Sequence, residues 1–452
     1  MKQEATNSDG HAVDVAADRN LLLTNPALAI AAMARRAGGI GVCKILGNNI
    51  LAISDALLSA RIQYDQDKLF CRSRQQKQLN GMFGRGLLTE EADEWSELHD
   101  SVNNSFGRNN ISKYHNTILA AIDANIENLS EPGETLELRL GHDTISWSIG
   151  TISSVLLGQR LSNAEINQIL NAYLDREQQT LEPTADKQPR SPFARLLKRM
   201  RRISSEIERR LAAPVNKALQ QNPEATPNLL LDINAELQRE SRCPFSHQQH
   251  NDLLKTLFLA GIQTSAYTLD WTLILLARHP QHWHRLATAV RGRLGQSPPS
   301  SDDLDALEPV QEVIKEVMRL RPVIHTIQKG VSKPLALAGV DLSPGDTINL
   351  SLLGIHNSDA YWADPDVFRP ERFATDIEPQ AFTPFGLGQH TCLGQHLALH
   401  VLRATLIRLL QRFDIVADPS LSLETESTFL LKPAHHHVIG LQPIDALPQE
   451  RT

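Results

Sequence analysis

The residues best suited to chemistry surround a single cysteine. Cys392 lies in the segment FGLGQHTCLG (385–394), whose three glycines let the backbone turn tightly and approach a large flat ligand closely. A helical pattern begins near Cys392 and places its sulfur at a helix N-terminus, where the helix dipole favours the thiolate. A thiolate bound to haem iron favours cleavage of an O–O bond. The segment therefore predicts a cysteine ligand to haem.

Two other interpretations of this segment stay open. A cysteine in a glycine-rich turn can be a buried structural residue. In addition, His390, Cys392, His396 and His400 are close in sequence, and His396 and His400 share a helix face, so a zinc site is the second alternative. A zinc site would leave the glycine pattern unexplained, whereas a haem ligand explains it.

A second segment, AGIQTS (260–265), lies in the middle of the longest predicted helix. Gly261 costs roughly 1 kcal/mol relative to alanine in a helix interior, so it predicts a close approach to a ligand with local opening of the helix. Thr264 is then placed to contact that ligand. The alternative is a threonine that hydrogen-bonds within its own helix.

A third set of residues pairs opposite charges. Glu316 and Arg319 lie one turn apart on a predicted helix and can form an ion pair, which a buried arginine would require. A surface salt bridge is the alternative. The later segment FRPERF (368–373) adds a further cation, Arg372.

Hydrophobic periodicity predicts a mainly α protein with a minor β part. A capping box at Ser162 and Glu165 marks one helix start, and Pro214 is expected to end another helix. The predicted helices are 162–176, 191–213, 246–278, 280–294, 308–320 and a last one from near Cys392 to 413. Strands are predicted in 38–54, 329–350, 429–431 and 438–441, with ordered coil over 365–384.

Composition narrows the function classes. The net charge of -7 argues against a nucleic-acid partner. The four cysteines are widely spaced, which predicts a reducing cytoplasm rather than a disulfide framework. No signal peptide and no apolar run of the ~20 residues needed to span a bilayer is found, so a soluble protein without a membrane span is expected. Residues 1–19 are predicted to be a disordered tail and residues 20–447 a single catalytic domain.

These motifs, in this order from about residue 38 to 441, resemble those of the cytochrome P-450 family. The resemblance implies a single large helical domain with small antiparallel sheets and haem b between the long central helix and the cysteine-loop helix. It implies that Cys392 is the axial iron ligand, that His390 contacts a haem propionate and that Phe385 shields the sulfur, with Gly386 and Gly394 shaping the loop. Glu316, Arg319 and Arg372 would form a structural triad.

The resemblance also implies roles for more distant residues, with three departures from the family pattern. The stretch Ala260, Gly261, Gln263 and Thr264 would activate oxygen, but Gln263 replaces a carboxylate and cannot shuttle a proton as an acid. Trp95 would donate to a propionate. His99 and Lys329 stand where the family has arginine, which predicts looser haem anchoring.

The function implied is a monooxygenase that inserts one oxygen atom from O2 into a hydrophobic small molecule, by hydroxylation or epoxidation, in secondary metabolism. Because no flavin or Rossmann motif follows, a separate ferredoxin and ferredoxin reductase are expected to donate electrons, docking near Arg403, Arg408 and Arg412. Alternatives are a peroxide-dependent or rearranging haem-thiolate enzyme and a non-catalytic haem sensor. Substrate contacts are expected from 63–82, 173–197, 257–264, 323–328 and 428–430.

Overall fold

A computed structural model shows how these segments come together. It describes residues 11–444 apart from 17, 46, 66–67, 80–82, 84–86, 89–98, 100–101, 130–134, 175–191, 222–226, 241–246 and 428. Among these residues no helix combines the length and the apolar character needed to cross a bilayer.

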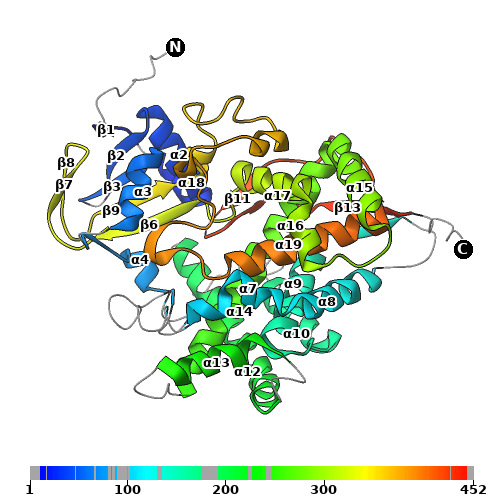
Figure 1. Cartoon of the computed structure of the whole chain (residues 1–452). Helices are drawn as coiled ribbons and strands as arrows, with labels where there is room; N and C mark the ends of the chain where they lie inside the picture. Colours follow the sequence, from blue (N-terminus) through cyan, green and yellow to red (C-terminus); the bar gives the residue numbers. More distant parts are fainter. Residues whose placement is uncertain are drawn as a thin grey trace, which may run out of the picture.

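Helices dominate the structure, as predicted, and fill the larger part of the molecule in Figure 1. They are α1 (Arg19–Thr24), α2 (Pro26–Arg36), α3 (Ala56–Tyr64), α4 (Arg74–Lys77), α7 (Arg108–Ser112), α8 (His115–Glu127), α9 (Asp143–Leu157), α10 (Asn163–Leu174), α12 (Pro192–Leu219), α13 (Leu229–Glu240), α14 (His247–Arg278), α15 (Pro280–Leu294), α16 (Ser301–Ala306), α17 (Glu308–Leu320), α18 (Leu352–His356) and α19 (Gln395–Arg412).

Local sequence signals set most helix ends. The helices α14, α15 and α17 match the predicted ranges to within one residue, and α15 carries proline at its first position. The predicted capping box is present before α10: the Ser162 N–H donates to Glu165 Oε2 (2.8 Å), and the Glu165 N–H donates to Ser162 Oγ (3.3 Å).

The predicted end of one helix before Pro214 is wrong, because α12 continues to Leu219. A proline inside a helix costs about 3 kcal/mol through a lost hydrogen bond and a steric clash. The apolar stripe of α12 nevertheless continues past it, since Val215 and Ala218 are buried like Leu211 before them. Burial of that stripe offsets the local cost.

Among the described residues the strands form four small sheets, the largest of which lies with α2, α3 and α18 at the upper left of Figure 1. This sheet has the order β1-β2-β3-β9-β6-β4 and the other three are β10-β13-β5, β11-β12 and β7-β8. The strands are β1 (Val13–Asp14), β2 (Ile40–Ile45), β3 (Asn48–Ile53), β4 (Phe70–Cys71), β5 (Leu136–Arg139), β6 (Thr326–Val331), β7 (Leu335–Leu337), β8 (Val340–Leu342), β9 (Thr347–Ser351), β10 (Phe413–Ile415), β11 (Thr425–Ser427), β12 (Leu431–Pro433) and β13 (Val438–Pro443).

Two details of the sheets differ from expectation. The largest sheet is mixed, because β3 and β9, which are far apart in the sequence, pair in parallel. The tail was expected to be disordered through residue 19, but Val13 pairs with Gly41 at the edge of β2, and Asp18 caps α1. The pairing satisfies backbone groups of β2 that would otherwise form an open edge.

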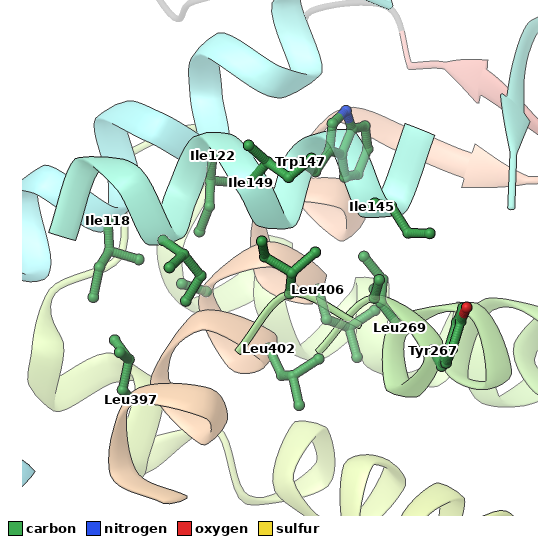
Figure 2. Close-up of a cluster of buried hydrophobic side chains, with 14 of the residues drawn as sticks. Ile118, Ile122, Ile145, Trp147, Ile149, Tyr267, Leu269, Leu397, Leu402 and Leu406 are labelled. Carbon is green, nitrogen blue, oxygen red and sulfur yellow. The ribbon is translucent and has the colours of Figure 1, made fainter. Parts of the chain in front are cut away.

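The hydrophobic core gathers around the C-terminal half of α14. Buried residues of four helices form this core: Ile122 of α8, Trp147 of α9, Leu269 of α14, and Leu402 and Leu406 of α19 (Figure 2). Residues 265–277 of α14 are all buried, which is typical of a helix enclosed by other helices. The core therefore fixes α14 against α19, the helix that follows the cysteine segment.

One carboxyl group in this core predicts an unusual pH dependence. Asp270 of α14 is 1% exposed and accepts a hydrogen bond from the Gly141 N–H (3.3 Å). Burial raises its pKa from 3.8 to about 7, against the opposing effects of Thr144, Gly141 and Lys432. Between these two pKa values the folded state holds a proton that the unfolded chain has released, so the free energy of unfolding falls as pH rises.

We expect Asp270→Asn to flatten this slope, because asparagine keeps the shape and cannot ionise. The full effect between pH 4 and 8 corresponds to roughly 4 kcal/mol. Urea unfolding of both proteins across this range measures it. Equal slopes in the two proteins would contradict the assigned ionisation of Asp270.

Candidate functional site

The cysteine loop, residues 385–394, folds back on itself just before α19. The Cys392 N–H donates to the Phe385 carbonyl (2.9 Å), and the Gly386 N–H donates to the Thr383 carbonyl (3.0 Å). Gly386 and Gly388 have φ angles of +73° and +70°, which L side chains rarely adopt. Since α19 is capped by Gly394, Cys392 lies just before the helix N-terminus, close to its expected place.

The Cys392 side chain is exposed, yet surrounding protein raises the pKa of its thiol, and the Gly394 N–H, which hydrogen-bonds to the sulfur, opposes this rise. An accessible but partly desolvated sulfur can serve as a ligand to a soft metal ion. The Gly394 N–H at the N-terminus of α19 lowers this pKa, as expected, but desolvation is the larger effect and the net shift is upward.

Positive charge gathers beside the loop. The pKa of His390 falls to about 3, first through burial and then through the charges of Lys329, Arg72 and His99. The structure thus brings together three residues predicted to meet haem propionates: His390, His99 and Lys329. Arg72 joins them and was missed, because no motif surrounds it. Trp95 lies outside the described residues.

These residues fit haem. An accessible sulfur can bind its iron, and basic side chains from separate segments can pair with its two carboxylates.

Two glycines of the loop allow a close approach to α3. A Cβ on Gly388 would lie 2.7 Å from the Gln63 carbonyl oxygen, and one on Gly386 would lie 3.4 Å from Gln63 Oε1. The Leu387 N–H donates to the same Oε1 (2.9 Å). Gln63 was predicted to contact substrate; its carboxamide contacts the cysteine loop instead.

Glu316, Arg319 and Arg372 meet in the interior, as the sequence indicates. Glu316 and Arg319 are fully buried and form two hydrogen bonds, of 2.8 and 2.9 Å, and Arg372 Nε donates to Glu316 Oε1 (3.1 Å). Arg319 also donates to the carbonyls of His356 and Pro365 (both 2.8 Å). The surface salt-bridge alternative is therefore wrong, and the buried charges are well satisfied.

The predicted oxygen-activating stretch lies within an unbroken α14, so the expected opening of the helix is not found. Thr264 Oγ1 donates to the Ala260 carbonyl (2.6 Å), as in the within-helix alternative, and the buried Gln263 donates from Nε2 to the Tyr267 hydroxyl (2.9 Å). Gly261 has a packing reason: a Cβ there would lie 3.0 Å from Ile152 Cδ1 of α9.

The three arginines expected to form a docking face pair with carboxylates of neighbouring elements. Arg403 bonds Asp305 (3.0 Å), while Arg408 and Arg412 both bond Asp123 (2.8 and 2.9 Å). Arg408 is also buried. Their charges are neutralised locally and tie α19 to α8 and α16, so they do not form the predicted positive patch.

The zinc alternative is not supported. His400 Nε2 lies 2.9 Å from His115 Nδ1, and His115 Nε2 donates to the Pro299 carbonyl (2.8 Å). Over the described part of the chain, no three His, Cys, Asp or Glu side chains are arranged to hold a metal ion.

Much of the expected substrate-contact segment 173–197, together with Thr428, lies outside the described residues.

Comparisons with known proteins point in one direction. A sequence profile described as Cytochrome P450 matches residues 20–439. Cytochrome P450 4X1 of Homo sapiens is 34% identical over 220 residues, which cover 47% of this chain and 43% of that protein. The first curated relatives are thus matched over less than half of their length.

Matches that cover most of the chain are also to cytochromes P450. The putative cytochrome P450 132 of Mycobacterium tuberculosis is 25% identical over 427 residues, covering 87% of this chain and 88% of that protein. The crystal structure of the cytochrome P450DA heme domain has a TM-score of 0.80 at 20% identity, covering 98% of this chain and 99% of that one, which is a likeness of fold.

Proposed function

The chain belongs to the cytochrome P450 family, whose cofactor is haem b with a cysteine thiolate ligand, and we propose that it is a monooxygenase. It inserts one oxygen atom of O2 into a hydrophobic small molecule by hydroxylation or epoxidation, and the other atom leaves as water. The accessible sulfur of Cys392, held beside a cluster of basic side chains, is the observation that carries this proposal. The catalytic domain spans residues 20–447.

Different residues of the site would bind the iron and the propionates of haem. Cys392 would bind the iron, and His390, His99 and Lys329 would pair with the propionates, together with Arg72 and Trp95. Phe385 would lie beside the sulfur, with Gly386 and Gly394 shaping the turn. When bound, haem supplies the centre at which O2 is reduced and its O–O bond is broken.

The helix α14 would supply Ala260, Gly261, Gln263 and Thr264. The Thr264 hydroxyl donates its hydrogen to the Ala260 carbonyl, so its oxygen can accept a hydrogen bond from a water and hold that water as the proton donor. The Gln263 amide cannot release a proton as an acid, and its Nε2 is already engaged with Tyr267. Proton delivery in this enzyme therefore depends on Thr264 and water.

We expect Thr264→Val, which removes the hydroxyl and keeps the branched shape, to lower product formation about 100-fold, the lower range for a lost proton-transfer group. Thr272→Val is the matched control, because Thr272 makes the same hydrogen bond to the residue four positions earlier (2.7 Å) further along α14. Product per electron consumed is the measurement. Equal losses in both variants would contradict a role for Thr264 in proton delivery.

Electrons are proposed to come from a separate ferredoxin and ferredoxin reductase. One observation favours a peroxide-dependent or rearranging enzyme as the second candidate: Gln263 stands in place of an acid and is held by Tyr267. Incubating the purified protein and a panel of terpenoids, polyketides and fatty acids with a surrogate ferredoxin system, or with peroxide alone, separates the two. Product with the ferredoxin system supports the monooxygenase, and product with peroxide alone supports the second candidate.

A role in secondary metabolism and a cytoplasmic location are part of the proposal. The cytoplasmic location is supported by the free thiols of Cys43, Cys71 and Cys392, which are expected in a reducing compartment.

A further inference from the structure

Two buried polar side chains from outside the cysteine loop hold the backbone at its start. His356 Nε2, at the end of α18, accepts the Thr383 N–H (3.1 Å), and Gln63 Oε1 of α3 accepts the Leu387 N–H (2.9 Å). Gln63 is 4% exposed and His356 is fully buried. The two bonds lie two residues to either side of Phe385, whose carbonyl accepts the Cys392 N–H.

We propose that Gln63 and His356 are positioning residues that fix the path of the cysteine loop and thereby aim the Cys392 sulfur at the haem iron. The inference rests on the proposed function, in which Cys392 is the axial ligand. Neither side chain touches the sulfur; each acts through the backbone that leads to it.

His356 also links the loop to the buried charge cluster. Its carbonyl accepts from Arg319 Nη1 (2.8 Å), and its ring packs against Phe382 with centroids 5.5 Å apart. Burial lowers the pKa of His356 to about 3, so the ring is neutral at ordinary pH and Nε2 remains an acceptor. One residue thus connects the Glu316–Arg319 pair to the first turn of the loop.

Gln63 is oriented by its own helix. Its Nε2 donates to Ser59 Oγ one turn earlier (3.2 Å), which leaves Oε1 facing the Leu387 N–H. The contact depends on the absence of side chains at Gly386 and Gly388, because a Cβ at Gly388 would collide with the Gln63 carbonyl. The two glycines and Gln63 therefore act together, which explains why the loop needs glycine where it meets protein.

The test removes each acceptor with little change in bulk. Gln63→Leu and His356→Phe leave a buried N–H unsatisfied, whereas Gln63→Glu and His356→Gln keep an acceptor oxygen. We measure the rate of haem transfer from the holoprotein to apomyoglobin and the spectrum of the reduced, carbon monoxide-bound form. Residues that orient a metal ligand typically contribute 10- to 100-fold to affinity, so we expect about tenfold faster haem loss in the first pair.

The spectrum gives a readout that a general loss of stability does not. In the acceptor-free variants, part of the red-shifted Soret band is expected to move to the position of a complex without thiolate, and the acceptor-keeping variants should recover it. Gln411→Leu is the matched control. Gln411 is a buried glutamine near the C-terminal end of α19, and its Nε2 donates to the carbonyls of Gly295 and Ser297 (2.9 and 2.8 Å). This control should leave both readouts at wild-type values.

Each outcome decides the question. A wild-type thiolate band with acceptor-free variants indistinguishable from Gln411→Leu overturns this inference alone. A wild-type protein that binds haem without a thiolate band overturns the proposed function and this inference with it. If the acceptor-free variants do not fold, the acceptor-keeping variants decide: retained band and haem affinity support the inference, and a loss of either overturns it.

Discussion

Cys392→Ala is expected to abolish the strongly red-shifted Soret band of the dithionite-reduced, carbon monoxide-bound protein. That band reports a thiolate on ferrous haem, and alanine has no atom to replace the sulfur. The sulfur is the accessible donor in a loop whose backbone is closed by the Cys392 N–H to Phe385 hydrogen bond, and this bond does not need the side chain. The loss should therefore be complete, while the fold is retained.

Cys71→Ala provides the control, because Cys71 is also a free cysteine but lies in β4. The absorption spectra of the three proteins, with haem content determined separately, make the comparison. A haem-loaded Cys392→Ala protein that keeps the thiolate band would show that another residue binds the iron, and the proposed mechanism would be wrong.

Glu316→Gln is expected to destabilise the protein by about 3–5 kcal/mol, because it leaves buried arginine charge without its partner. Glu316 accepts from Arg319, from Arg372 and from the Arg369 N–H (2.9 Å), and it is fully buried. Glutamine keeps one acceptor oxygen but no charge. Because the same cluster reaches His356 and hence the cysteine loop, haem retention should fall along with the free energy of unfolding.

A neighbouring carboxylate gives the matched control. Glu312, one turn earlier in α17, bonds Arg285 (2.9 Å), whose side chain is 40% exposed. An ion pair at such a surface position contributes about 0.2–1 kcal/mol, so Glu312→Gln should change stability little. Urea unfolding and haem per protein are measured for both variants. Similar losses of stability and of haem in the two variants would contradict a larger contribution from the buried Glu316 than from the surface ion pair.

The sequence by itself determined the features that depend on neighbours within a few residues. Helix ends at Pro280 and at the Ser162 capping box follow from local hydrogen bonding, and the Glu316–Arg319 pair follows from helical spacing. Gly386 and Gly388 marked a turn that L side chains rarely adopt. The motifs were sufficient to indicate the family and the cysteine that binds haem in the proposed mechanism.

Only the tertiary structure decided which distant group each of these residues meets. The close approach permitted by Gly388 is to Gln63, and the positive charge of Arg408 is neutralised by Asp123, 285 residues away. The helix that Pro214 was expected to end continues, because a buried stripe outweighs the local penalty. Such partners are set by the packing of whole elements, whose free energy is summed over many contacts, and no short segment of sequence contains that sum.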